Sequence, residues 1–234
     1  MLRQGLIEPA ISEWTFNVVL KQKKDCSLRF CIDYRCLNEA SRKNLYPLPR
    51  IDSCRDAMAG ACWFSTLDPR AGYHQVKMKP SSAEKTTFVT REGTFKFRVM
   101  PFGLTVARAT FQRLMDMIMA GLNLEICLVY LDDIIVFASG VHEHLKRLMS
   151  IFERLLGARL KLKPPKCTMF QKSVSFLGHV ISERRVATDP GKVECVVIWP
   201  VPSSIRDVSS FVGLCNYYRR FIHSFAEIAA PLHN

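Results

Sequence analysis

The chain of 234 residues lacks several features that would set it apart from ordinary globular proteins. It has no apolar run near the ~20 residues that a helix needs to cross a bilayer. Residues 1–6 lead into mixed polar sequence without the apolar core of a secretory signal. None of the nine cysteines lies in a C-x-x-C pair, so we interpret them as reduced thiols rather than zinc ligands. We expect an intracellular protein without membrane contact.

Acidic residues are also scarce. The chain has 21 Asp and Glu against 33 Lys and Arg, a formal net charge of +12. A field of that sign attracts polyanions, of which nucleic acid is the commonest. Acidic membranes are the competing partner, but no basic amphipathic helix with a clean apolar face is visible. The length and the 48% apolar content suit one large globular domain or two small ones.

Against this basic background, residues 129–136 (VYLDDIIV) place two adjacent carboxylates within a strand-forming apolar run. Val, Ile and Tyr favour strands, whereas Asp is tolerated in turns, so we predict a β-hairpin whose turn carries Asp132 and Asp133. A further Asp would complete an all-oxygen site for hard cations such as Mg²⁺. Two such ions about 4 Å apart clamp the oxygens of a phosphoryl transfer. The alternative is a solvated acidic turn on a surface hairpin.

Hydrophobic periodicity predicts an α+β fold in which helices back an antiparallel sheet. Apolar residues recur at helical steps over 111–122 and 145–157. The second helix begins with His142 and His144 around Glu143, which we interpret as a solvated helix start rather than a metal site. Phe64–Asp68 reads as a strand that ends in a carboxylate. The other predicted strands are 16–21, 28–34, 86–89, 94–99, 158–163 and 174–181.

The C-terminal residues differ from the rest. Asp189-Pro190 is a helix-start signature, and Ser204 to Asp207 offers a capping box for a further helix. We therefore expect a small helical region over 185–234.

Asp68 lies 64 residues before Asp132, so only the folding of the chain can bring these two carboxylates together. An ordered series of motifs also runs through the chain. The motifs are Arg29–Asn38 (RFCIDYRCLN), Tyr46–Asp52 (YPLPRID), Phe64–Asp68 (FSTLD), Met100–Leu104 (MPFGL), Ala109–Met115 (ATFQRLM), Leu128–Phe137 (LVYLDDIIVF), Phe176–Val180 (FLGHV) and Tyr217–Ile222 (YYRRFI). In this order they resemble the reverse transcriptases of gypsy-class LTR retrotransposons.

The resemblance implies a right-hand polymerase with an antiparallel palm sheet and a small helical thumb. Fingers would comprise about 1–43 and 76–110, palm about 44–75 and 111–184, and thumb 185–234. No RNase H, protease or integrase region is expected. The protein would be cytoplasmic, with the nucleus as the alternative.

By the same resemblance, Asp68, Asp132 and Asp133 are the catalytic carboxylates that hold two Mg²⁺ ions, with Mn²⁺ as an alternative. The ions would serve the attack of a primer 3′-hydroxyl on a deoxynucleoside triphosphate, opposite an RNA or DNA template. The sequence gives no oligomeric state.

Four further residues are implied to bind the nucleotide. Arg29 and Lys23 would contact the triphosphate. Tyr73 resembles an aromatic steric gate against a 2′-hydroxyl, the alternative being a ring that fills the core. Gln112 resembles a glutamine that contacts the nucleotide, the alternative being a solvated polar position.

Two later segments are implied to hold the primer and its duplex. Phe176, Leu177, Gly178 and His179 resemble the primer grip, and a buried strand end is the alternative. The aromatic and cationic residues of 217–221 suit a duplex backbone, although a helical core with one basic face would have the same pattern.

The chain departs from the family pattern near the predicted site. Pro69 and Arg70 follow Asp68 where Leu and Lys are usual, and Val106 and Arg108 replace an Asn and a Pro. These changes favour a second hypothesis, a catalytically degenerate retroelement remnant that only binds nucleic acid. A third is a basic α+β protein with an acidic turn.

Overall fold

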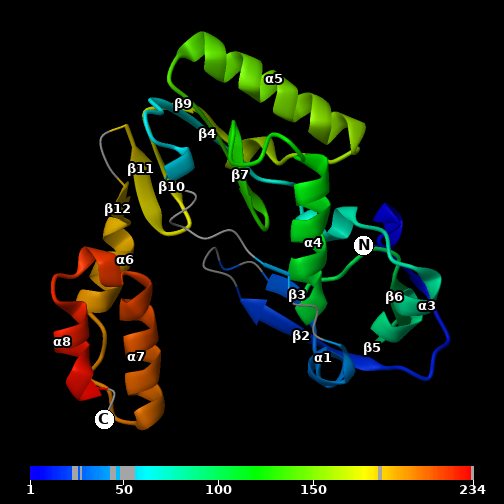
Figure 1. Cartoon of the computed structure of the whole chain (residues 1–234). Helices are drawn as coiled ribbons and strands as arrows, with labels where there is room; N and C mark the ends of the chain where they lie inside the picture. Colours follow the sequence, from blue (N-terminus) through cyan, green and yellow to red (C-terminus); the bar gives the residue numbers. More distant parts are fainter. Residues whose placement is uncertain (23–25, 27, 43–45, 48–55, 184–185, 233–234) are drawn as a thin grey trace.

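A computed structural model describes residues 1–22, 26, 28–42, 46–47, 56–183 and 186–232. These residues form three sheets, with helices packed against them and a helical region at the C-terminus (Figure 1). The predicted α+β class is confirmed. Within the described residues, no helix is both long and apolar enough to cross a membrane.

The first sheet lies towards the N-terminus and has the strand order β1-β6-β5-β2-β3. Strand β2 runs parallel to β5, and the other pairs are antiparallel. Its small core centres on Tyr34, whose buried hydroxyl donates a hydrogen bond to the Thr86 carbonyl at 2.9 Å. The elements are η1 (Leu2–Gln4), β1 (Ile7–Pro9), β2 (Phe16–Gln22), β3 (Leu28–Ile32), α1 (Arg35–Ala40), α3 (Pro80–Ala83), η3 (Glu84–Thr86), β5 (Phe88–Thr90) and β6 (Gly93–Phe97).

The central sheet is antiparallel, with the order β7-β8-β4-β9. Strand β8 is buried on both faces, so its alternating side chains supply two cores. Ile134 and Val136 pack with α4 and α5, whereas Ile135 and Phe137 pack with the third sheet. The elements are β4 (Trp63–Leu67), η2 (Gly72–Gln75), α4 (Thr105–Ile118), β7 (Cys127–Tyr130), β8 (Asp133–Ala138), α5 (Val141–Gly157), η4 (Pro164–Lys166) and β9 (Thr168–Gln171).

The third sheet, β10-β11-β12, leads into the C-terminal helices (Figure 1). Both predicted caps are confirmed: Asp189 accepts a hydrogen bond from the Gly191 N–H, and Ser204 accepts one from the Asp207 N–H. The elements are β10 (Ser173–Phe176), β11 (His179–Ser182), β12 (Val186–Thr188), α6 (Pro190–Val197), α7 (Ile205–Tyr217), η5 (Arg219–Phe221), α8 (Phe225–Ala229) and η6 (Ala230–Leu232).

Three local predictions were wrong. Residues 158–163 form no strand; Arg159 adopts a left-handed conformation after α5, and only Leu162 bridges, to Pro69. Residues 174–181 form two strands rather than one, because Leu177 and Gly178 both adopt positive φ and turn the chain. His144 is fully buried and its Nε2 lies 2.7 Å from Ser65 Oγ, because α5 packs this side of its first turn on β4.

Candidate active site

Strand register brings the three carboxylates to one edge of the central sheet. Strand β4 pairs antiparallel with β8, and the last pair in their ladder is Leu67 with Ile134. The residue after Leu67 is Asp68 and the residue before Ile134 is Asp133, so an antiparallel ladder sets these two side by side. Asp132 occupies the two-residue turn between β7 and β8. The predicted hairpin is therefore present, with Asp133 as the first residue of β8 rather than in the turn.

Gln112 of α4 holds this turn in place. Its Oε1 accepts a hydrogen bond from the Leu131 N–H at 2.6 Å, and its Nε2 donates to the Val129 carbonyl at 3.2 Å and to Asp116 at 3.0 Å. Leu131 has φ +52°, a conformation that is costly for a side chain larger than glycine, so the turn needs such support. The amide of Gln112 is fully buried. The residue is therefore not a solvated position, and in this structure its amide supports the turn that bears Asp132.

The acidic turn carries an electrostatic penalty. Burial, together with the negative charges of Asp133 and Asp68, raises the pKa of Asp132 to about 6, against the smaller opposing effects of Lys166 and Arg108. Partial burial and the charge of Asp68 also raise the pKa of Asp133. Among the described residues, Asp132 Oδ1 is a buried oxygen without a hydrogen-bond partner. Such an arrangement favours an added cation.

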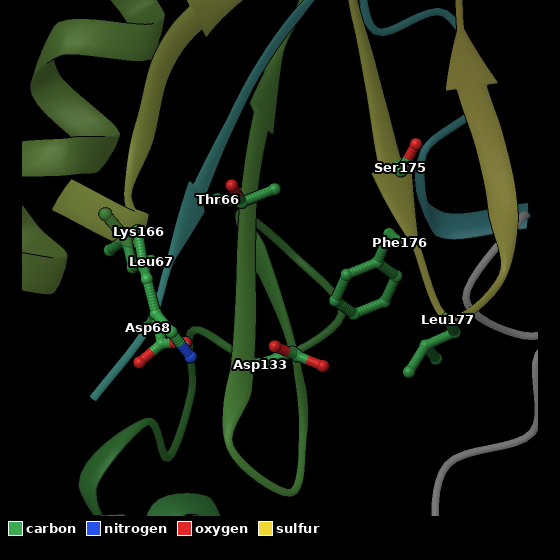
Figure 2. A pocket seen from close by; sticks show the side chains of 8 residues that line it. All are labelled: Thr66, Leu67, Asp68, Asp133, Lys166, Ser175, Phe176 and Leu177. Carbon is green, nitrogen blue, oxygen red and sulfur yellow. The ribbon is translucent and has the colours of Figure 1, made fainter. Parts of the chain in front are cut away.

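Lys166 supplies one cation from the protein itself. Its Nζ lies 2.9 Å from Asp68 Oδ2. Figure 2 shows Asp133 between Lys166 and Asp68 on one side and Phe176 and Leu177 on the other, around a pocket of about 180 Å³. Pockets that enclose a whole small ligand measure roughly 300–1,000 Å³, so this one is too small to enclose such a ligand completely.

The donor set matches a hard divalent cation. All three side chains are carboxylates, which Mg²⁺ prefers, and Asp132 contributes an oxygen with no other partner. Across the described ranges, however, no three acidic, His or Cys side chains stand close enough together to hold a metal ion. Asp68 is instead paired with Lys166. The residues therefore fit Mg²⁺ in chemistry, and in this structure Asp68 Oδ2 is engaged by Lys166.

The loop after Asp68 is fixed by residues 161–163. The Arg70 N–H donates to the Lys161 carbonyl and the Lys163 N–H donates to the Asp68 carbonyl, both at 2.8 Å. Pro69 lies between these two hydrogen bonds, opposite Leu162. At this position the antiparallel pairing needs no N–H from residue 69. Proline is thus compatible with the loop.

Gln75 clamps the same loop by bonding both the N–H and the carbonyl of Lys161, at 2.7 and 2.9 Å. It also donates to the carbonyl of Arg70, at 3.0 Å.

Tyr73 is largely buried beside the acidic turn. Its ring lies 5.5 Å from Phe111 and 5.2 Å from Phe102, measured between centroids. Burial and the nearby charge of Asp132 raise the pKa of Tyr73, while Arg108 lowers it. The ring therefore fills the core, as the alternative expectation held, and also borders the acidic site. Arg108, one of the departures from the family pattern, adds a positive charge here.

The predicted primer-grip segment is the tip of the β10–β11 hairpin, and the C-terminal helices hold it. The Tyr217 hydroxyl donates to the Leu177 carbonyl at 2.7 Å. A Cβ on Gly178, whose φ is +74°, would lie 2.7 Å from the Tyr218 hydroxyl, so a larger residue would strain the backbone and force that hydroxyl to shift. The His179 ring packs against Tyr217, Tyr218 and Phe221, with centroids 5.5 to 5.6 Å apart. Tyr218 is buried, whereas Tyr217 and Phe221 pack on His179 and remain half-exposed.

Two predicted nucleotide contacts cannot be placed. Lys23 lies outside the described residues. Arg29 lies in β3 opposite Lys21, and its side chain is likewise outside the description.

Sequence reasoning missed Lys166 and Gln75. Gln75 contacts Lys161, 86 positions away, and Lys166 contacts Asp68, 98 positions away, and no spacing signal marks either contact. The only hint for Lys166 was its positive charge after a Pro-Pro turn.

Comparison with known proteins agrees with this geometry. The family described as reverse transcriptase (RNA-dependent DNA polymerase) matches residues 21–181. The chain belongs to the reverse transcriptase family. It is 40% identical over 99% of its length to the Retrovirus-related Pol polyprotein from transposon 297 of Drosophila melanogaster, and 34% identical over 99% to that from transposon gypsy. It spans 22% and 23% of those two polyproteins, about a fifth of their length.

Solved structures show the same fold. The foamy viral protease-reverse transcriptase dRH in complex with ds DNA superimposes with a TM-score of 0.90 over 99% of this chain and 41% of that one. The foamy viral enzyme in complex with RNA/DNA hybrid gives 0.85, over 99% of this chain and 31% of that one. Both are 24% identical to this reverse transcriptase domain. The predicted right-hand polymerase fold is confirmed, as is the resemblance to LTR retrotransposons.

Proposed function

We propose that this chain is an RNA-directed DNA polymerase domain that adds deoxynucleotides to a primer 3′-hydroxyl on an RNA or DNA template. The observation that carries the proposal is the acidic sheet edge: register sets Asp68 beside Asp133, and the adjoining turn presents a buried, unpartnered oxygen of Asp132. We assign the fingers to about 1–43 and 76–110, the palm to about 44–75 and 111–184, and the thumb to 185–234.

Asp68, Asp132 and Asp133 would hold two Mg²⁺ ions, with Mn²⁺ as an alternative. When bound, the ions lower the pKa of the primer hydroxyl and neutralise charge on the triphosphate. The protein would then contribute by holding the catalytic carboxylates in fixed positions. Gln112 fixes the turn that bears Asp132, and Gln75 fixes the loop that follows Asp68.

Lys166 neutralises Asp68 while the metal is absent. Lys166 also lines the pocket, so its ammonium group would be available to an anionic substrate bound there. The ion pair therefore keeps an otherwise repulsive cluster of three carboxylates compatible with folding.

Tyr73 is proposed as the sugar gate, supported by its place between Phe111 and the acidic turn. Tyr73→Ala should let the enzyme incorporate ribonucleotides, whereas Tyr73→Phe keeps the ring and should retain the preference for deoxynucleotides. Competition between the two nucleotide types in primer extension measures this. An unchanged preference in the Ala variant would leave Tyr73 with a core role alone.

Residues 176–179 are proposed to seat the primer end, because Phe176 and Leu177 line the pocket with Asp68 and Asp133. Arg29 and Lys23 are retained as proposed triphosphate contacts on the family resemblance alone.

One observation favours a second candidate, a remnant that binds nucleic acid without catalysis. Asp68 is engaged by Lys166, and the carboxylates are not gathered at metal-binding distance. If that pairing cannot be exchanged for a metal ion, the basic surface would still bind a primer–template.

Primer extension on an RNA template with Mg²⁺ tests the proposal, and fluorescence anisotropy of the labelled duplex measures binding separately. Wild type should extend the primer and Asp132→Asn should not, with equal binding by both. Glu125→Gln, an exposed carboxylate at the other end of β7, is the matched control and should extend normally. If wild type extends no better than Asp132→Asn although both bind, the remnant hypothesis holds.

A further inference from the structure

Strand β7, which leads into the acidic turn, is an edge strand of the central sheet. It ends the order β7-β8-β4-β9, so among the described strands only β8 pairs with it. Val129 in β7 is nevertheless buried, with 1% of its surface exposed, so its N–H and carbonyl need partners within the protein. Side chains take the place of a neighbouring strand. Asn123 Oδ1 accepts a hydrogen bond from the Val129 N–H at 3.3 Å, and Gln112 Nε2 donates one to the Val129 carbonyl at 3.2 Å.

Both of these side-chain amides also bond one carboxylate, Asp116 of α4. Gln112 Nε2 lies 3.0 Å from Asp116 Oδ1, and Asn123 Nδ2 lies 3.4 Å from the same oxygen. An ionised carboxylate only accepts hydrogen bonds, so each amide must turn its NH2 group towards Asp116 and its oxygen towards the strand. The Gln112 oxygen then meets the Leu131 N–H, in the acidic turn itself, at 2.6 Å. A reversed Gln112 amide would set two donors against each other at Leu131.

The other oxygen of Asp116 has a partner from a distant part of the chain. The Tyr46 hydroxyl, 70 residues away, donates to Asp116 Oδ2 at 2.8 Å. This hydrogen bond, together with burial and the charge of Asp116, raises the pKa of Tyr46, so the hydroxyl remains a donor. The guanidinium carbon of Arg113 lies 5.4 Å from the centre of the Tyr46 ring, on the same side of α4. Tyr46 thus fixes the rotation of the Asp116 carboxylate.

We propose that Asp116 is a positioning residue for the acidic turn and that Tyr46 acts through it. One oxygen of Asp116 orients two amides, and these amides hold the open edge of β7 and the Leu131 N–H. The turn held in this way carries Asp132. The kinetic consequence rests on the proposed polymerase function, because Asp132 must be in place for the reaction. The consequence for the hydrogen bonds of β7 is independent of that function.

Hydrogen exchange followed by NMR tests the arrangement without any need for activity. Val136 is the internal reference, because it lies in β8 with a strand on either side and reports global unfolding. Relative to Val136, Asp116→Leu should speed the exchange of the Val129 and Leu131 amides about tenfold, as expected when about one hydrogen bond is lost. Asp116→Asn should stay within about threefold of wild type, because Asn can turn its oxygen to the two amides and its NH2 group to the Tyr46 hydroxyl.

Primer extension tests the kinetic consequence. Asp116→Leu should lower kcat about tenfold and leave the KM for primer–template within about twofold, since it displaces Asp132 and not the binding surface. Tyr46→Phe should lower kcat about threefold by itself and cause no further loss in the Asp116→Leu background. Glu153→Leu, the same kind of change at an exposed position of α5, is the matched control and should leave kcat unchanged.

The proposal is overturned if the Val129 and Leu131 amides exchange in Asp116→Leu as they do in wild type. It is equally overturned if Asp116→Asn exchanges as fast as Asp116→Leu, because the retained oxygen would then orient nothing. Full additivity of Tyr46→Phe and Asp116→Leu would refute the action of Tyr46 through Asp116. If wild type extends no primer, the polymerase proposal fails, whereas hydrogen exchange still decides the role of Asp116.

Discussion

Replacing Asp132 with Asn should make the metal-free protein more stable at neutral pH while it removes the proposed activity. The pKa of Asp132 rises from 3.8 to about 6 on folding, mainly through burial and the charges of Asp133 and Asp68. The folded state therefore binds the proton more tightly than the unfolded state. At pH 7 the side chain must be ionised in surroundings that disfavour the charge, and this costs stability.

The magnitude follows from the shift. A change of about two pKa units, at about 1.4 kcal/mol each, corresponds to about 3 kcal/mol as an upper value. The penalty is fully present above the folded pKa of about 6 and disappears below the unfolded value of 3.8, where both states are protonated. Asn has no charge to bury, so its advantage over Asp should appear at pH 7.5 and shrink towards zero near pH 4.

Urea denaturation of wild type and Asp132→Asn, without divalent ions, measures the free energy of unfolding at both pH values. Asp207→Asn is a control of opposite sign, because hydrogen bonds from Ser204 and Ser203 lower the pKa of Asp207. Its Asn variant should lose stability at neutral pH. If the Asp132→Asn advantage is the same at both pH values, or if Asn is the less stable residue at pH 7.5, the electrostatic reasoning is wrong.

Three more variants test the site from other sides. Gln112→Met keeps the side-chain volume but removes three hydrogen bonds, so the free energy of unfolding, measured by heat or urea, should fall by about 2–4 kcal/mol. An unchanged free energy of unfolding would show that Gln112 does not stabilise the turn. Lys166→Met frees Asp68, so less Mg²⁺ should be needed for half of the maximal rise in Tm; a higher requirement would show that Lys166 assists metal binding. Gly178→Ala should raise the KM for primer more than it lowers kcat, because the new Cβ meets the Tyr218 hydroxyl. Gly60→Ala is its control, with a similar positive φ and no atom within 4 Å; equal effects of the two would attribute the change to backbone strain alone.

The sequence by itself determined the features that depend on neighbouring residues. Strand-forming residues around Asp132 and Asp133 defined the hairpin, apolar spacing defined α4 and α5, and the side chains of Asp189 and Ser204 defined two helix starts. These signals are local, because a turn, a cap or an amphipathic face is encoded within a few residues. The family resemblance added the fold, since its motifs run in order along the chain.

Only the tertiary structure decided which groups each side chain meets. The ladder between β4 and β8 sets Asp68 beside Asp133, and η4 brings Lys166 to Asp68 from 98 residues away. The sequence could not show that Gln112 is buried under the acidic turn or that His144 bonds Ser65. These contacts depend on the packing of whole helices and sheets against one another, and no short-range pattern specifies that packing. The acidic pair was visible in the sequence, whereas its neutralising lysine and its supporting glutamine were products of the fold.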